Sequence, residues 1–271
     1  MSIFTLLNRK ILKDGSVDVK FFLNRGFMLG EGVFTTCLVK NNRILFEREH
    51  FERLHHASEL FGLKFNEEGL SEAVYQCLDQ QSFQNEWFRL RITLSRTQTK
   101  SGLKIQGNEE AIEVIQISSY QPQQNPIHLR LDCAHKKYHV CMNGIKHLGY
   151  QNSIMAYYEA IKSGFEDAIL LSVHGNIACS SVANIFFKKE GQWYTPPLDE
   201  GIIPGIIRRK ILSTGKIKEL KVSISDIKKY SSCFITNSLN GCRPVARINE
   251  QYFKHNDQDI QNFNEFIGYN F

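Results

Sequence analysis

The hydrophobic pattern of the first half of the chain predicts short strands interleaved with two helices. Between positions 47 and 63, apolar side chains recur every three or four residues, at Phe51, Leu54, Ala57 and Phe61, and this spacing forms one buried helix face. The residues on either side of Lys40-Asn-Asn42 favour strands joined by that turn. The expected elements are strands over 33–39, 43–46, 87–95 and 111–117 and helices over 47–63 and 70–83.

A stretch poor in apolar residues divides the chain near its middle. Tyr120-Gln-Pro-Gln-Gln-Asn-Pro126 contains two prolines and three glutamines, and no apolar residue separates the prolines, which is typical of a linker. We therefore predict an N-terminal α+β domain over 1–119, an interdomain linker over 120–127 and a C-terminal domain over 128–271.

The second half again mixes strands and helices. Gly164 ends a helical stretch that begins near Tyr150, and Pro204, a residue type favoured at helix starts, precedes a short helix. Because strands and helices do not alternate regularly, we expect an α+β fold with mixed sheets and not a doubly wound parallel sheet. The expected elements are strands over 128–134, 167–173, 184–188, 233–236 and 245–248 and helices over 150–163, 205–212 and 257–267.

Composition limits the class of protein. The 271 residues are 42% hydrophobic and 23% charged, as in ordinary globular proteins, and are enough for two cores. No apolar run approaches the ~20 residues of a membrane span, and the N-terminus lacks the pattern of a secretion signal. The seven cysteines are scattered, without the spacing of a metal site. We expect a cytoplasmic protein that binds neither membrane nor metal.

The charge pattern concerns the type of partner. The net charge is +5, but lysine and arginine are spread along the chain and form no basic stripe interleaved with aromatic residues. A nucleic-acid partner is therefore not expected. The mild positive bias suits a small anionic ligand.

Several residues are of types suited to chemistry. Gly205 opens the short helix, whose first backbone N–H groups can bind a phosphate-sized anion, although an ordinary helix start has the same sequence. Lys146 is flanked by apolar residues, and partial burial suits a Schiff-base lysine; a surface lysine is the alternative. Arg53 is either solvated or reaches a phosphate. Thr35 and Thr36 are neighbours on a strand, so only one of them can face a given cavity.

Taken in order, these segments resemble a known enzyme family. The likeness lies in Asn24-Arg-Gly-Phe-Met-Leu-Gly-Glu-Gly-Val-Phe-Thr-Thr36, His50-Phe-Glu-Arg-Leu54, Lys146-His-Leu148, Ala183-Asn-Ile-Phe186 and Tyr194-Thr-Pro-Pro-Leu-Asp-Glu-Gly-Ile-Ile-Pro-Gly-Ile206. Together they resemble the class IV aminotransferases, pyridoxal phosphate enzymes of fold type IV that include branched-chain and D-amino-acid aminotransferases and aminodeoxychorismate lyase. The resemblance implies a two-domain, D-amino-acid aminotransferase-like α+β fold with the active site at the domain interface. It also implies pyridoxal 5′-phosphate as cofactor and a homodimer.

By position, the resemblance assigns roles to individual residues. It makes Lys146 the covalent anchor of the cofactor and the group that moves protons. It places Thr36, or its neighbour Thr35, toward the substrate, and gives Asn184 a part in shaping the chain near the cofactor ring. It assigns the cofactor phosphate to the guanidinium of Arg53, the backbone N–H groups of Ile206 and Ile207 and the hydroxyl of Ser238.

Three segments are similar to the lyase of this family. Phe34-Thr-Thr36 stands where aminotransferases have Phe-Glu-Thr, and Gly144-Ile-Lys-His-Leu148 looks like the lysine segment of the lyase. Ile235-Thr-Asn-Ser-Leu239, followed by Pro244-Val245, also resembles the lyase form. The favoured function is therefore conversion of 4-amino-4-deoxychorismate to 4-aminobenzoate and pyruvate in folate synthesis. The alternatives are an aminotransferase acting on D- or branched-chain amino acids and a cofactor-binding relative with weak or lost catalysis.

Cys179 departs from the family pattern. Counted back from Asn184, it occupies the position of a glutamate that pairs with the pyridine nitrogen of the cofactor and keeps it protonated. A neutral thiol cannot hold a buried positive charge as a carboxylate does. Either catalysis is weakened, or the reaction needs less electron withdrawal by the ring. The lyase reaction is helped by forming an aromatic ring and transamination is not, so this difference again favours the lyase.

The substrate of the lyase is a dicarboxylate, so cationic partners are expected. Several relatives have an aromatic residue in the segment that corresponds to Ser95-Arg-Thr-Gln-Thr-Lys-Ser-Gly-Leu103, and this chain has none there. Each candidate can equally be a structural or surface residue. The candidate cations are Arg91, Lys100 and Arg243.

Overall fold

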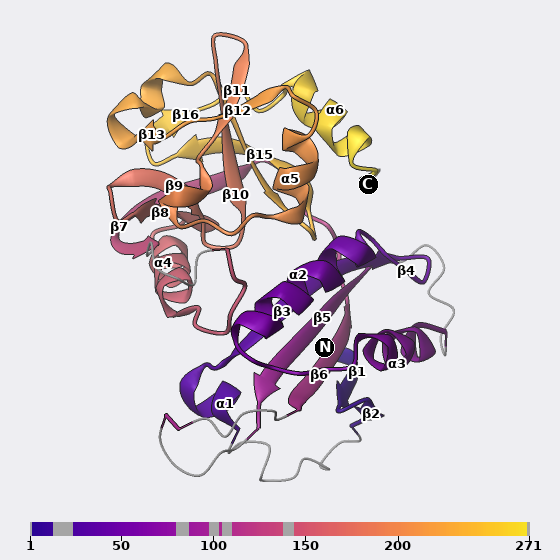
Figure 1. Cartoon of the computed structure of the whole chain (residues 1–271). Helices are drawn as coiled ribbons and strands as arrows, with labels where there is room; N and C mark the ends of the chain where they lie inside the picture. Colours follow the sequence, from indigo (N-terminus) through magenta and orange to yellow (C-terminus); the bar gives the residue numbers. More distant parts are fainter. Residues whose placement is uncertain are drawn as a thin grey trace. The chain divides into compact units, whose positions relative to one another are not determined.

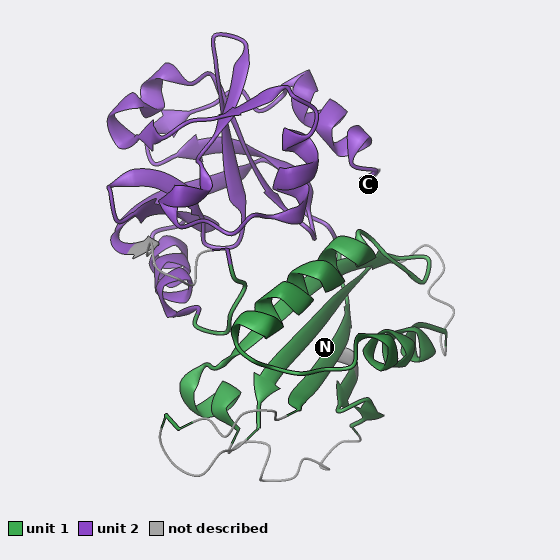
Figure 2. Cartoon of the chain, in the orientation of Figure 1, with its two compact units in different colours: residues 1–121, 145–149 green, residues 122–144, 150–271 purple. Residues whose placement is uncertain are grey.

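The protein folds into two compact units (Figure 2). The structure, a computed structural model, describes residues 2–12, 24–79, 87–97, 103–104, 110–137 and 144–269. The first unit comprises Met1–Gln121 together with Ile145–Gly149, and the second comprises Pro122–Gly144 and Tyr150–Phe271. The main boundary thus lies at Gln121, inside the stretch rich in proline and glutamine.

The segment that carries Lys146 lies in the first unit, although the sequence prediction placed it in the C-terminal domain. The physical reason is backbone pairing with an early strand. Phe34 N donates to Lys146 O at 2.9 Å, and Leu148 N donates to Gly32 O at 2.9 Å. A short excursion of the chain therefore returns to the first unit and pairs there.

The described strands of the first unit form one six-stranded sheet with the order β2-β1-β6-β5-β3-β4 (Figure 1). All pairings within this sheet are antiparallel. Its helices are α1 (Arg25–Leu29), α2 (Glu47–Leu60) and α3 (Glu67–Asp79). Its strands are β1 (Ser2–Leu7), β2 (Lys10–Ile11), β3 (Gly32–Lys40), β4 (Arg43–Ile44), β5 (Trp87–Arg96) and β6 (Ala111–Ser119).

The core of the first unit lies between the sheet and the helices α2 and α3. Phe51, Leu54 and Ala57 of α2 are buried in it, as the helical spacing predicted. The helix ends at Leu60, earlier than predicted, where Gly62 takes a left-handed φ of 60°. α3 begins earlier than predicted, and two glutamates fill its first turn, where acidic side chains are favourable.

In the second unit, the described strands form a ten-stranded sheet with the order β12-β11-β10-β14-β15-β7-β8-β9-β13, and β16 pairs with β15. The sheet is mixed, because β7 runs parallel to both β8 and β15 while most other pairs are antiparallel. Its strands are β7 (Ile127–Lys137), β8 (Asp167–Ser172), β9 (Asn176–Ser180), β10 (Asn184–Lys189), β11 (Gln192–Thr195), β12 (Ile217–Glu219), β13 (Val222–Ser223), β14 (Ser232–Asn237), β15 (Gly241–Ile248) and β16 (Gln251–Tyr252).

Helices cover parts of this second sheet. α4 packs on β7 and β8, and α6 packs on β15. The α+β class with mixed sheets is therefore confirmed. Among the described residues, no helix combines the length and the apolar character that crossing a membrane requires. The helices are α4 (Gln151–Lys162), α5 (Ile206–Leu212) and α6 (Gln258–Phe266), with 3-10 turns over Leu198–Glu200 and Ile224–Lys229.

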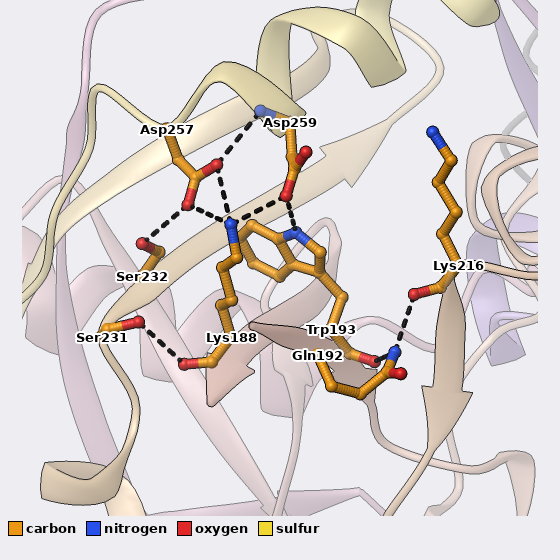
Figure 3. Close-up of polar contacts among 8 residues, drawn as sticks. All are labelled: Lys188, Gln192, Trp193, Lys216, Ser231, Ser232, Asp257 and Asp259. Carbon is orange, nitrogen blue, oxygen red and sulfur yellow. Dashed lines mark hydrogen bonds and ion pairs between the residues drawn. The ribbon is translucent and has the colours of Figure 1, made fainter. Parts of the chain in front are cut away.

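A polar network fixes the start of α6 to the sheet (Figure 3). Lys188 Nζ on β10 lies 2.9 Å from Asp257 Oδ2 and 2.8 Å from Asp259 Oδ2. Trp193 Nε1 donates to Asp259 at 2.9 Å, and Ser232 Oγ donates to Asp257 at 3.1 Å. Burial opposes the charge on Lys188, but its bonds to the two aspartates raise its pKa overall. The same bond from Lys188 lowers the pKa of Asp259.

Replacing Lys188 with Met is expected to lower the free energy of unfolding by about 1–3 kcal/mol near pH 7, since two carboxylates lose a charged partner. The lowered pKa of Asp259 makes this contribution present above the ordinary aspartate range and lost as the pH falls through the pKa in the fold. The raised pKa of Lys188 makes it disappear again at strongly alkaline pH. Urea unfolding at several pH values measures both effects. Lys189→Met is the control, and equal loss in both variants would contradict the role of the network.

Candidate functional site

One face of β3 gathers two cations around a single aromatic ring. Lys146 Nζ lies 4.4 Å from the centroid of the Phe34 ring, and Arg91 Cζ lies 3.8 Å from it. Thr36 is the register partner of Arg91 across β3 and β5. Cross-strand partners point to the same face of a sheet, and Thr36 shares its face with Phe34. The structure thus brings together three residues singled out from the sequence, in an arrangement that suits an anion.

Local packing explains how Lys146 is presented. Its neighbour Ile145 is buried in the core of the first unit, and the backbone of this segment pairs with β3 around Val33. Extended neighbours point in opposite directions, so burying Ile145 turns Lys146 away from that core. The half-buried amine is held by a fixed backbone and not by a loose loop.

The opposite face of β3 holds Thr35 against α2. Thr35 Oγ1 lies 2.7 Å from His50 Nδ1, and Arg53 Nη2 donates to Thr35 Oγ1 at 2.8 Å. The alternation expected for two adjacent threonines therefore separates them, with Thr36 on the face of Lys146 and Thr35 on the face of Arg53. Burial raises the pKa of the neighbouring Cys37 thiol to about 12, so this cysteine stays protonated and unreactive at neutral pH.

In the second unit, the first turn of α5 presents backbone donors. The side chains of Ile206 and Ile207 are buried, and no described residue accepts a hydrogen bond from either backbone N–H. Unpaired N–H groups at a helix start, together with the helix dipole, favour an anion. The buried guanidinium of Arg208 instead binds Pro196 O and Glu219 and holds α5 in place.

The approach to α5 is packed too closely for a larger residue at its N-cap. A Cβ added to Gly205 would overlap Asn184 Oδ1. Asn184 Nδ2 in turn donates to Ile203 O at 2.9 Å, so this side chain shapes the chain that leads into the helix. In the sequence, the only signal was a glycine directly after a proline. The structure shows that the close approach of Asn184 requires a residue without a Cβ at this position.

Ser238 lies in the turn between β14 and β15. Its carbonyl oxygen accepts a hydrogen bond from Tyr269 Oη at 2.5 Å. The part of the chain that the structure describes contains no hydrogen-bond partner for its hydroxyl, which is half-buried. The hydroxyl is therefore available to a ligand.

Cys179 lies on β9, where it is buried against Ala178 and Ile202. Two residues further on, Ser181 Oγ donates to the carboxyl group of Asp167, which also accepts from Ala168 N at 2.7 Å. Burial raises the pKa of Asp167 in spite of these bonds. Burial therefore disfavours the ionised form of Asp167.

The structure gives the other candidate cations different positions. Arg243 Nε donates to Asn125 O at 2.7 Å, and its Nη2 lies 3.0 Å from Glu166 Oε1, so this side chain is engaged in holding the chain together. Lys100 lies outside the described residues. Sequence reasoning did not single out Phe34 as the ring shared by Lys146 and Arg91; its position directly before the two threonines was the available signal.

Comparison with known proteins places these residues in a family context. The family model described as amino-transferase class IV matches residues 32–248. A Thermotoga maritima protein provisionally named a branched-chain-amino-acid aminotransferase is 31% identical over 112 residues, which cover 37% of this chain and only 41% of that protein. The aminodeoxychorismate lyase of Vibrio harveyi is 23% identical over 235 residues, covering 83% of this chain and 86% of the relative.

Solved structures share the fold over the full chain. A Legionella pneumophila protein provisionally named 4-amino-4-deoxychorismate lyase superposes with a TM-score of 0.85 at 23% identity, covering 95% of this chain and 97% of that one. This likeness confirms the two-domain fold predicted from the sequence.

Proposed function

The chain belongs to the class IV amino-transferase family, and on this basis we propose that it is a pyridoxal phosphate-dependent 4-amino-4-deoxychorismate lyase. Such an enzyme releases 4-aminobenzoate and pyruvate and serves folate synthesis. Enzymes of this family use pyridoxal 5′-phosphate as cofactor. The relatives carry the names of both lyases and aminotransferases, so the choice between these reactions rests on residues of this chain.

The donor set of this chain fits the phosphate and aldehyde groups of the cofactor. The unpaired N–H groups at the start of α5 and the hydroxyl of Ser238 suit a phosphate, and the close packing of Gly205 on Asn184 keeps that helix start fixed. Arg53, whose Nη2 donates to Thr35, would reach the phosphate by its place in the family motif. The primary amine of Lys146 suits an aldehyde. When bound, the cofactor supplies an electron sink that stabilises negative charge on a substrate carbon.

The residues on the face of Lys146 would handle the substrate. We assign to Lys146 both the covalent attachment of the cofactor and the transfer of protons at the substrate carbon. Arg91 would hold a carboxylate of the substrate, since its guanidinium lies on the same ring as Lys146. Thr36, its cross-strand partner, would add a hydroxyl on that face.

The observation that carries the choice of a lyase is the thiol of Cys179. A carboxylate at this position would hold a proton on the pyridine nitrogen, and a buried thiol, when protonated, would lack the charge to do so. Elimination of pyruvate from aminodeoxychorismate forms an aromatic ring, and this gain offsets a weaker electron sink. Transamination must store electrons in the cofactor and return them, so it depends more strongly on the sink.

Two further functions deserve a test. An aminotransferase acting on branched-chain amino acids is supported by the name of the Thermotoga maritima relative, and one acting on D-amino acids is the other aminotransferase that the sequence motifs leave open. A cofactor-binding protein with weak or lost catalysis is supported by Cys179 itself. The two experiments that follow separate these possibilities from the lyase.

Purified protein is expected to be yellow and to release 4-aminobenzoate from aminodeoxychorismate generated in the assay. Lys146→Ala should lose the bound colour on gel filtration and lower the rate of release by at least about 10²–10⁴-fold, because the amine both anchors the cofactor and moves protons. Absorbance and product fluorescence measure the two effects, with Lys189→Ala as the control. Efficient exchange of amino groups without 4-aminobenzoate would instead establish an aminotransferase.

Replacing Cys179 with Glu tests the role of the thiol directly. An unpaired carboxylate in this buried place should lower the melting temperature of the cofactor-free protein, and binding of the cofactor should restore part of that loss through the ring nitrogen. Lyase activity should stay or rise, and amino-group exchange should rise more. Cys179→Ser is the size-matched control. Complete loss of lyase activity with intact cofactor binding would mean that the ring environment requires the thiol.

We further propose that the protein is a homodimer, since α4 exposes apolar side chains on one face. These apolar residues recur every three or four positions along α4, and an apolar helix face of this kind normally packs against another element or another protein. A charge introduced there should give monomers in sedimentation velocity, so the double variant Ile154→Asp/Tyr158→Asp tests the face and Asn262→Asp, on the exposed side of α6, is the control. A monomeric wild-type protein would refute the proposal. The exposed apolar residues are Ile154, Met155, Tyr157, Tyr158 and Ile161.

A further inference from the structure

The turn between β14 and β15, residues 237–241, is held from outside by the C-terminal segment. Tyr269 Oη donates to Ser238 O at 2.5 Å. Asn264 on α6 reaches the residue directly after the turn, where its Oδ1 accepts from Cys242 N at 2.7 Å and its Nδ2 donates to Cys242 O at 2.8 Å. One asparagine therefore pairs with both backbone groups of Cys242, much as a neighbouring strand would.

The chain that connects the two halves holds the same turn. Gln124 Nε2 donates to Asn240 O at 2.7 Å, and Gln123 N donates to Asn240 Oδ1 at 2.9 Å. Gln124 Oε1 also lies 3.4 Å from Asn264 Nδ2, so the two outer supports contact one another. Segments more than 100 positions apart in the sequence thus meet on one short turn.

The turn has little freedom to move. A Cβ added to Gly241 would lie 2.6 Å from Asn264 Oδ1 and 3.0 Å from the Tyr269 ring, and its φ of 59° is one that glycine adopts readily. Inside the turn, Asn237 Oδ1 accepts from Leu239 N at 3.0 Å and from Asn240 N at 2.9 Å. Four backbone groups of the turn are therefore occupied, Ser238 O, Leu239 N, Asn240 N and Asn240 O, while the hydroxyl of Ser238 makes no bond to the described residues.

The start of α6 is held by contacts separate from those that its far end makes with the turn. Its start is already fixed by Lys188 through Asp257 and Asp259, and Ile260 and Phe263 are buried beneath it. Asn264 and Tyr269 lie at the other end and direct their polar atoms at the backbone beside Ser238. These hydrogen bonds hold the turn and the residue that follows it.

We propose that Asn264 and Tyr269 are positioning residues that hold the Ser238 hydroxyl in place for the phosphate of the cofactor. The inference rests on the proposed function, which assigns that phosphate to Ser238. A serine hydroxyl has a short reach, so a displacement of the turn by even about 1 Å takes it out of hydrogen-bond distance. Fixing the turn before the ligand arrives removes an ordering cost from binding.

The test compares two ligands that differ only in the phosphate. The full-length protein, freed of cofactor, is titrated with pyridoxal 5′-phosphate and with pyridoxal, following the absorbance of the bound aldehyde. Tyr269→Phe and Asn264→Ala should each raise the Kd for pyridoxal phosphate about 3- to 10-fold, as for one lost hydrogen bond, and leave the Kd for pyridoxal unchanged. Asn262→Ala, on the exposed side of α6, is the matched control and should change neither Kd.

Ser238→Ala gives the reference for a lost phosphate contact. Adding Tyr269→Phe to Ser238→Ala should cause no further loss, because the tyrosine acts through the serine. The proposal is overturned if Ser238→Ala weakens pyridoxal phosphate binding and Tyr269→Phe does not, or if affinity for pyridoxal falls equally. Tyr269→Phe retains the ring and its packing, so this arm stays decisive even if Asn264→Ala unfolds. Unchanged binding in both Ser238→Ala and Lys146→Ala would overturn the proposed function as well, which separates the two failures.

Discussion

The alternation of side chains along β3 is the constraint on which the candidate site depends. A strand sends neighbouring residues to opposite faces, so Thr35 is committed to His50 and Arg53 while Phe34 and Thr36 remain for Lys146 and Arg91. A shift of one residue in the pairing with β5 would exchange these sets. The buried positions Val33, Cys37 and Val39 make such a shift costly, because they would leave the core. Packing of apolar residues thus determines the chemistry of the polar ones.

In the second unit the constraint is satisfaction of backbone hydrogen bonds. Side chains occupy the groups around each proposed ligand contact: Asn184 binds Ile203 O before α5, and Asn237, Gln124 and Tyr269 bind the turn that carries Ser238. Around these contacts, the backbone N–H groups of Ile206 and Ile207 and the hydroxyl of Ser238 make no hydrogen bond to the described residues. A rigid surround with a few free donors is what recognition of a phosphate requires, since the donors need no rearrangement on binding.

The sequence predicted the elements better than their assembly. Period and composition were sufficient for α2 and for the mixed α+β class, and five ordered motifs were sufficient for the family. The assignment of Lys146 to a unit could not be predicted, because it depends on backbone pairing with β3 across more than 100 residues. The engagement of Arg243 by Glu166 is likewise a long-range ion pair that leaves no local pattern. The hydrogen bonds of Asn264 and Tyr269 to the chain around Ser238 could not be predicted either, because they join separate elements and leave no local pattern.

The burial around Cys179 indicates how a thiol and a carboxylate would differ at this position. Asp167, which binds the same segment through Ser181, has a raised pKa because burial outweighs the donors that surround its carboxyl group. A second carboxylate at position 179 would meet the same burial and would need the cationic ring of the cofactor to offset it. A thiol, which is neutral when protonated, would not carry that cost in the cofactor-free protein. A thiol in place of a carboxylate would also give less stabilisation to a protonated pyridine ring. At this one position, the residue that favours the cofactor-free protein would therefore weaken the electron sink of the bound cofactor. A reaction whose product is aromatic tolerates a weaker sink, and this is the argument from Cys179 for the lyase that we propose.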